Sequence, residues 1–196
     1  MRPLGQFDFK KQRKSPYVED YEPGLVYLFQ YPRTRVLPNI SPFCIKLETW
    51  LRIADINYKN VEGLPFSIRS REGTLPFVEL DGIEYPDSNL AIEDLTSILN
   101  KDSVEAHLND EQKAMSRAFE VVVENSLLYA HLKFRLQYAK DLFSLYKPGT
   151  LDPLTAAMIP TYWKKAVTKM INVSFIGKHF EDNIRRISEQ GGCSSF

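Results

Sequence analysis

The sequence predicts an α/β N-terminal half, built on a small mixed sheet, followed by an all-helical half. Three observations support this fold class. A strand pattern at residues 26–31 precedes an amphipathic helix pattern that starts near Ser41, and a second strand pattern follows at residues 57–61. An Asp-Gly pair at residues 81–82 lies between two alternating runs, which is the strongest short hairpin signal. Strand signals fade after Asn100, where apolar residues take helical spacing.

The first strand and the first helix are the clearest elements of the N-terminal half. Residues 26–31 (VYLFQY) are rich in β-branched and aromatic residues, as in a buried strand. Ser41 fits the N-cap of the helix, and Pro42 fits its first position, where the missing N–H costs nothing. One apolar stripe then follows at helical spacing: Phe43, Leu47, Trp50, Leu51 and Ala54. Residues 57–61 predict the second strand, and one helical turn is expected near residues 66–70.

Residues 75–95 (LPFVELDGIEYPDSNLAIEDL) predict two strands, a tight turn between them and the start of another helix. Asp87 or Ser88 stands at the N-cap of that helix. A helical crossover between strands implies a parallel pair, whereas a two-residue turn implies an antiparallel pair. The sequence therefore predicts a mixed sheet with the element order βαβαββα.

The C-terminal half carries helical patterns only. Apolar residues at helical spacing begin at Met115 and predict a helix that runs to about residue 145. A second helix is expected over residues 156–170, interrupted by Pro160, and a third over residues 177–190. This half is therefore predicted to be all-helical.

Bulk properties narrow the classes of function. Lys plus Arg and Asp plus Glu number 25 each, so no basic excess favours nucleic acid as a partner. The two cysteines lie far apart and form no disulfide framework. Without an apolar run of about 20 residues or a signal peptide, we expect a cytoplasmic protein with no transmembrane segment. The histidines follow no metal-binding spacing, so no metal is expected: His107, His131 and His179.

The chain is expected to divide into three parts. Residues 1–24 are polar and broken by prolines, which predicts a flexible leader. Basic residues at 10–14 leave two interpretations open, a solvated tail and a contact with an acidic membrane surface. Residues 25–100 form the sheet domain, and residues 101–196 form the helical domain.

The order of elements resembles the glutathione transferase architecture, in which a thioredoxin-like domain precedes a helical domain. More narrowly, SPFCIKLETWLRIADINYKN at residues 41–60, together with the LPFVELDG block and the DS pair after it, resembles the failed-axon-connections family. The cadmium-responsive proteins and the metaxins are relatives in that superfamily. The resemblance covers about residues 25–145. Compared with such proteins, the loop at residues 33–40 is long and the helical half, ending in GGCSSF, looks truncated.

The resemblance implies a glutathione site. Leu75-Pro76 resembles the cis-proline signature of thioredoxin-like folds, and Asp87-Ser88 resembles the pair that holds the γ-glutamyl end of glutathione. Ser41 lies where family members place a catalytic Ser, Cys or Tyr. At a helix N-terminus, its hydroxyl could hold a thiolate, although an ordinary N-cap is the competing interpretation.

Cys44 is the alternative catalytic residue, because a helix N-terminus lowers the pKa of a thiol. With serine at position 41, no disulfide can form within the S-x-x-C stretch. Cys44 also lies beside the apolar stripe of its helix, so a buried structural cysteine competes with the catalytic interpretation.

Two classes of function stay open. One is an enzyme, a glutathione transferase that binds glutathione or another small thiol and transfers it to an electrophile. The other is a non-catalytic scaffold for a protein partner in axonal development or at an organelle membrane surface, as in the metaxins. Ser41 and the Asp87-Ser88 pair favour the enzyme, whereas the long loop and short helical half favour the scaffold. The resemblance also leaves a homodimer open, without support from this chain's own residues.

Overall fold

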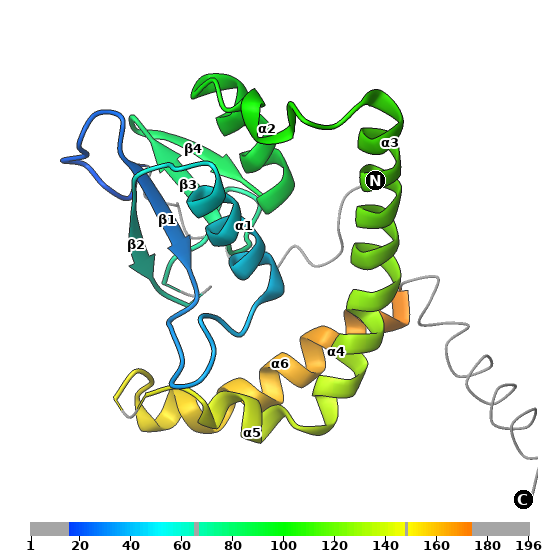
Figure 1. Ribbon diagram of the computed structural model, residues 1–196. Helices are drawn as coiled ribbons and strands as arrows, with labels where there is room; N and C mark the ends of the chain where they lie inside the picture. Colours follow the sequence, from blue (N-terminus) through cyan, green and yellow to red (C-terminus); the bar gives the residue numbers. More distant parts are fainter. Residues whose placement is uncertain (1–15, 65–66, 148, 174–196) are drawn as a thin grey trace, which may run out of the picture. The chain divides into compact units, whose positions relative to one another are not determined.

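The computed structural model describes residues 16–64, 67–147 and 149–173, which fall into two compact units (Figure 1). The first unit holds the described residues up to Asn109 together with those of the short stretch Leu145–Thr150. The second unit holds Asp110–Ser144 and the described residues from Leu151 onward. Each unit has a core of its own.

The first unit is built on a four-stranded mixed sheet with the strand order β2-β1-β3-β4. The strands are β1 (Val26–Gln30), β2 (Tyr58–Glu62), β3 (Phe77–Leu80) and β4 (Ile83–Pro86). β1 pairs in parallel with β2, and β3 runs antiparallel to both β1 and β4. The prediction of one parallel crossover and one antiparallel hairpin is therefore confirmed.

The hairpin turn between β3 and β4 has the geometry that its sequence predicts. Asp81 has a φ of 50° and Gly82 a φ of 76°. A turn of this kind needs positive φ at both central residues, which glycine adopts without strain and aspartate tolerates better than most side chains. Local turn chemistry thus sets the register of the hairpin.

Two helices, α1 (Pro42–Ile53) and α2 (Ser88–Ile98), cover one face of this sheet (Figure 1). Their shared core is completely or almost completely buried: Val26, Leu28, Leu47, Leu51, Ala54, Ile56, Val78, Leu80, Ala91 and Leu95. The buried face of α1 is shifted from the predicted stripe. Cys44 and Glu48 are buried on it, whereas Phe43 and Trp50 are only half-buried.

The opposite face of the sheet carries a second core. Its buried members are Tyr27, Phe29, Leu75 and Phe77. Tyr17 packs on this core, with its ring centroid 5.5 Å from that of Phe29 and 5.7 Å from that of Phe77. The backbone N–H of Tyr17 donates to both carboxylate oxygens of the buried Glu79, at 3.0 and 3.1 Å. These bonds supply partners that a buried carboxylate needs.

The segment before β1 therefore differs from its prediction. The hydroxyl of Tyr17 also donates to the carbonyl of Arg69 at 2.9 Å, which connects the segment to the loop before β3. The prediction of a flexible leader does not hold for residues 16–24, because their hydrogen bonds and ring contacts attach them to the sheet. Residues 1–15 lie outside the described residues.

The chain between β2 and β3 contains a short hydrogen-bonded turn. The N–H groups of Ser67 and Ile68 both donate to the carbonyl of Leu64, at 2.8 Å. The bond from Ile68 to Leu64 has the i→i+4 spacing of a single helical turn, which agrees with the one turn expected near residues 66–70. Ile68 packs against the second core, so a loop covers part of the sheet face there.

The second unit is helical, as predicted. The 3-10 turn η1 (Asp102–Glu105) still belongs to the first unit. The helices of the second unit are α3 (Asp110–Val122), the π-helical η2 (Val123–Leu127), α4 (Leu128–Gln137), α5 (Ala139–Ser144) and α6 (Pro153–Val173). The buried side chains of Leu132, Val167 and Ile171 pack α4 against α6.

Two helix predictions in this unit need correction. The expected helix to residue 145 is divided by η2 and by a break at Tyr138. The expected interruption at Pro160 does not occur, because α6 continues through it. The helix predicted over residues 177–190 lies outside the described residues. Within the described part of the chain, no helix is both long and apolar enough to cross a membrane.

Candidate functional site

The candidate residues gather at one edge of the sheet. The register places Phe77, the first residue of β3, beside Phe29 near the end of β1 and beside Pro86 at the end of β4. Residues 75–76 directly precede β3, and residues 87–88 directly follow β4. Both predicted pairs therefore lie at the same edge of the sheet.

The N-termini of α1 and α2 also lie next to each other. Lys46, in the first half of α1, donates a hydrogen bond from Nζ to the side-chain oxygen of Asn89, the second residue of α2. Ser41 directly precedes α1, and Asp87 directly precedes α2. Each helix N-terminus carries a partial positive charge, so this edge favours a negatively charged group.

The peptide bond between Leu75 and Pro76 is cis, as the resemblance implies. Both residues are buried. Among the residues that the structure describes, neither the N–H nor the carbonyl of Leu75 forms a hydrogen bond with another backbone group. The backbone at Leu75 can therefore pair with an extended peptide, since buried backbone groups need partners.

Asp87 is the N-cap of α2. Its carboxylate accepts hydrogen bonds from the N–H groups of Asn89 at 2.8 Å and Leu90 at 3.4 Å. Both bonds end on Oδ1, so the cap does not use Oδ2. Asp87 is exposed, whereas Ser88, the first residue of α2, is buried. One carboxylate can thus cap the helix and still receive a positively charged group.

Ser41 holds the N-cap position of α1 without using its side chain as a cap. Its backbone N–H donates to the side-chain oxygen of Asn39 at 2.9 Å. Cys44 lies one turn further into the helix, three residues after Ser41. The Ser41 hydroxyl is therefore not consumed by the backbone of α1.

Cys44 is completely buried in the core. Burial raises the pKa of its thiol to about 11, and hydrogen bonds from Tyr31 and Ser41 offset only part of that rise. At pH 7 the side chain is therefore a neutral thiol, although it lies near a helix N-terminus. This environment is that of a structural cysteine and disfavours the catalytic alternative.

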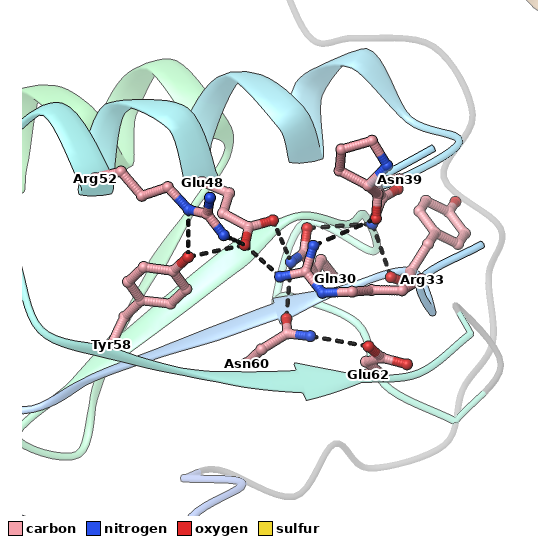
Figure 2. Close-up of polar contacts among 10 residues, drawn as sticks. Gln30, Arg33, Asn39, Glu48, Arg52, Tyr58, Asn60 and Glu62 are labelled. Carbon is pink, nitrogen blue, oxygen red and sulfur yellow. Dashed lines mark hydrogen bonds and ion pairs between the residues drawn. The ribbon is translucent and has the colours of Figure 1, made fainter. Parts of the chain in front are cut away.

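A buried polar network surrounds Glu48, and sequence analysis did not identify it (Figure 2). Glu48 is its centre: Oε1 accepts from Tyr58 at 2.8 Å and from Arg52 at 3.2 Å, and it is also paired with Arg33. Oε2 accepts from Gln30 at 3.0 Å. Burial raises the pKa of Glu48, but its hydrogen bonds from Arg33, Gln30 and Tyr58 outweigh burial and lower it below the usual value.

The network continues from Gln30 toward Ser41. The side-chain oxygen of Gln30 accepts from Nδ2 of Asn39 at 3.2 Å, and Asn39 also donates to the carbonyl of Tyr31 at 2.7 Å. On its other side, Gln30 donates to Asn60 at 2.7 Å. Two signals in the sequence point to this network: Gln30 interrupts the apolar and aromatic strand predicted at residues 26–31, and Glu48 shares a helix face with Cys44.

No group of three or more His, Cys, Asp or Glu side chains in the described ranges is placed to hold a metal ion. His179 lies outside those ranges.

Comparisons with known proteins add to this picture. The family model of the glutathione S-transferase N-terminal domain matches residues 42–141. The protein "Failed axon connections" of Drosophila melanogaster is 36% identical over 205 residues, which cover 94% of this chain and 48% of the relative. The chain thus spans about half the length of that relative. A crystal structure of glutathione transferase Omega 2S from Trametes versicolor is also similar, with 16% sequence identity and a TM-score of 0.41. The aligned region covers 76% of this chain and 72% of the chain in that structure.

The matched range includes most of the candidate site. Residues 75–76 and 87–88 lie inside it, whereas Ser41 directly precedes its first residue. The match begins with α1 and extends into α5.

Proposed function

This chain belongs to the family of proteins with a glutathione S-transferase N-terminal domain, and from that premise we propose that it binds glutathione at the sheet edge formed by residues 75–76 and 87–88. The convergence of the Leu75 backbone and the Asp87 cap at one edge of the sheet carries the proposal. This edge offers a backbone for pairing, a carboxylate for an ammonium group and two helix N-termini for negative charge.

Each part of the ligand would meet a different part of the edge. The peptide backbone of glutathione would pair with the N–H and carbonyl of Leu75. The γ-glutamyl ammonium would approach Oδ2 of Asp87, which the helix cap does not use. A hydrogen bond between two charged groups is stronger than one between neutral groups, so Asp87 supplies a large share of the affinity. The buried Ser88 would lie beside the γ-glutamyl carboxylate at the start of α2.

Ser41 would act on the thiol. Its hydroxyl would donate a hydrogen bond to the glutathione sulfur, which stabilises the thiolate and lowers the pKa of the bound thiol. The proton of the thiol would leave to solvent, and the sulfur electron pair would then form a bond to carbon of an electrophile. That carbon would either release a leaving group with its electron pair, or, in an addition to a double bond, the π electrons would take a proton from solvent. The product is a thioether of glutathione, formed without oxidation of either partner.

A second function, as an interaction protein, has an observation of its own. Large apolar side chains of α3 are exposed: Met115 at 54%, Phe119 at 65% and Val122 at 56%. They recur at helical spacing, so they form one apolar stripe of the helix. A partner that covers this stripe would suit a non-catalytic scaffold, and the name of the relative refers to axon connections.

Titration calorimetry with reduced glutathione, on the full chain and on Asp87→Asn, tests the first function. Asparagine caps a helix about as well as aspartate, so Asp87→Asn removes the charge and spares the start of α2. We expect the affinity to fall at least about tenfold, as for a lost charge-assisted hydrogen bond. The matched control is Asp94→Asn, which removes an equal charge from an exposed position further along α2.

Two results would contradict the proposal. If Asp87→Asn and Asp94→Asn bind glutathione equally well, the ammonium does not meet Asp87. If the folded wild-type chain binds no glutathione, the site has no ligand of this kind, and the interaction function becomes the better proposal. Ser41→Ala adds a further distinction, because we expect it to lower turnover and leave the affinity nearly unchanged.

A further inference from the structure

We propose that Glu48, Gln30 and Asn39 form a relay of side chains that fixes the position of the Ser41 backbone, and that they are positioning residues for the candidate site (Figure 2). Only the effect on bound glutathione rests on the proposed function. The relay itself is a property of the folded chain.

The relay begins at a group that can only accept hydrogen bonds. Glu48 is ionised at neutral pH, and its Oε1 receives donors from Arg33, Arg52 and Tyr58. Its Oε2 accepts a hydrogen bond from the side-chain nitrogen Nε2 of Gln30. An ionised carboxylate has no proton to donate, so whichever side-chain atom of Gln30 faces Glu48 must be the amide nitrogen.

This constraint passes from one amide to the next. Because Nε2 of Gln30 faces Glu48, its oxygen must face the other way, toward Asn39. Asn39 then has to present its own nitrogen to Gln30, which places its oxygen toward the backbone N–H of Ser41. The carbonyl of Tyr31, which also accepts from Nδ2 of Asn39, supports the same orientation. The charge of Glu48 thus sets the orientation of the Gln30 amide, and Gln30 and the Tyr31 carbonyl together set that of the Asn39 amide.

Water cannot easily replace a member of this relay. Gln30 is 0% exposed, Asn39 1% and Glu48 4%. A buried polar group that loses its partner pays a desolvation cost, so a wrong amide orientation is disfavoured at every step. Ser41 lies at the end of the relay, where the loop after β1 becomes α1. Its carbonyl accepts a hydrogen bond from the N–H of Ile45 at 3.1 Å, and its own N–H is held by Asn39, so the relay fixes the side of Ser41 that faces the loop.

Glu48→Gln tests the relay, because glutamine has the same shape and can donate as well as accept. Amide hydrogen exchange measured by NMR should show the N–H of Ser41 exchanging at least about fivefold faster in this variant, as expected for one lost hydrogen bond. Exchange at amides of β1 normalises for any change in global stability. Glu22→Gln is the matched control, since it removes the same charge from an exposed pair with Lys59.

Asn39→Ala is the second variant. It removes the acceptor of the Ser41 N–H directly and leaves the hydrogen bonds of Glu48 to Gln30 and Tyr58 in place. It also serves as the test if Glu48→Gln does not fold. Both variants should also raise the pKa of glutathione bound to the chain, followed by the ultraviolet absorbance of its thiolate. A merely structural role of Glu48 would lower global stability without this change.

The outcomes separate the relay from the proposed function. Faster exchange at Ser41 in Glu48→Gln and Asn39→Ala, but not in Glu22→Gln, supports the relay, whether or not the wild-type chain binds glutathione. Absence of glutathione binding alongside that exchange pattern overturns the proposed function only. Unchanged exchange at Ser41 in a folded Glu48→Gln variant overturns the relay.

Discussion

Replacing Tyr17 by alanine should destabilise the first unit by about 2 to 4 kcal/mol, because the structure makes this residue part of the sheet core. Its ring contacts two others, at centroid distances of 5.5 and 5.7 Å. Each aromatic pair contributes about 0.5–1.5 kcal/mol beyond area burial. The hydroxyl donates to the carbonyl of Arg69, which adds about 1 kcal/mol.

Two further variants separate these contributions. Tyr17→Phe keeps both ring contacts and loses only the hydroxyl, so it should cost about 1 kcal/mol. Tyr21→Ala is the matched control, a tyrosine of the same segment whose exposure of 38% predicts a change of about 0.5 kcal/mol or less. The order of destabilisation should therefore be Tyr17→Ala, then Tyr17→Phe, then Tyr21→Ala.

Urea unfolding measures these differences, followed by the fluorescence of Trp50. This tryptophan lies on α1 in the first unit, so the measurement is made in a Trp163→Phe background that silences the second unit. Equal unfolding free energies for Tyr17→Ala and Tyr21→Ala would refute the reasoning. They would show that residues 16–24 contribute nothing to the fold, as a flexible leader would.

Two other predictions concern ionisable groups of α1. Because burial raises the pKa of Cys44 from 9.0 to about 11, the folded chain in a Cys193→Ser background should react with a thiol reagent at pH 8 about a hundredfold more slowly than the unfolded chain. Equal rates would contradict its burial. The pKa of Glu48 is lowered, so the stability it provides is present above the ordinary value of 4.5 and is lost as the pH falls through the folded pKa. Acid unfolding curves should therefore be shallower for Glu48→Gln than for the wild type and unchanged for Glu22→Gln, and identical slopes for all three would contradict this assignment.

The parts of the fold that sequence analysis predicted depend on local chemistry. Positive φ at residues 81–82 follows from an Asp-Gly pair, whatever the rest of the chain does. The start of α2 follows from Asp87, whose side chain reaches the N–H groups one turn ahead. The parallel and antiparallel pairings follow from the lengths of the connections.

The features that sequence analysis missed depend on partners far away in the chain. Tyr17 is fixed by Glu79, which lies 62 residues further along the sequence. A polar, proline-containing segment predicts a flexible leader unless its distant partner is known. Glu48 is likewise held by side chains from β1, from the loop after it and from β2. Periodicity locates the buried face of α1 only approximately, and it does not show which charge on that face has partners.

The environments of Ser41 and Cys44 restrict the chemistry that this edge of the sheet can perform. Transfer through a mixed disulfide needs a protein thiolate that attacks the sulfur of a disulfide. Cys44 is a buried neutral thiol, so it does not provide one at neutral pH. The hydroxyl of Ser41 forms no disulfide and can only donate to, or accept from, a sulfur that another molecule brings. If glutathione binds at this edge, its own sulfur is therefore the nucleophile, and the reaction that fits is addition to an electrophilic carbon, with Ser41 held in place by Asn39.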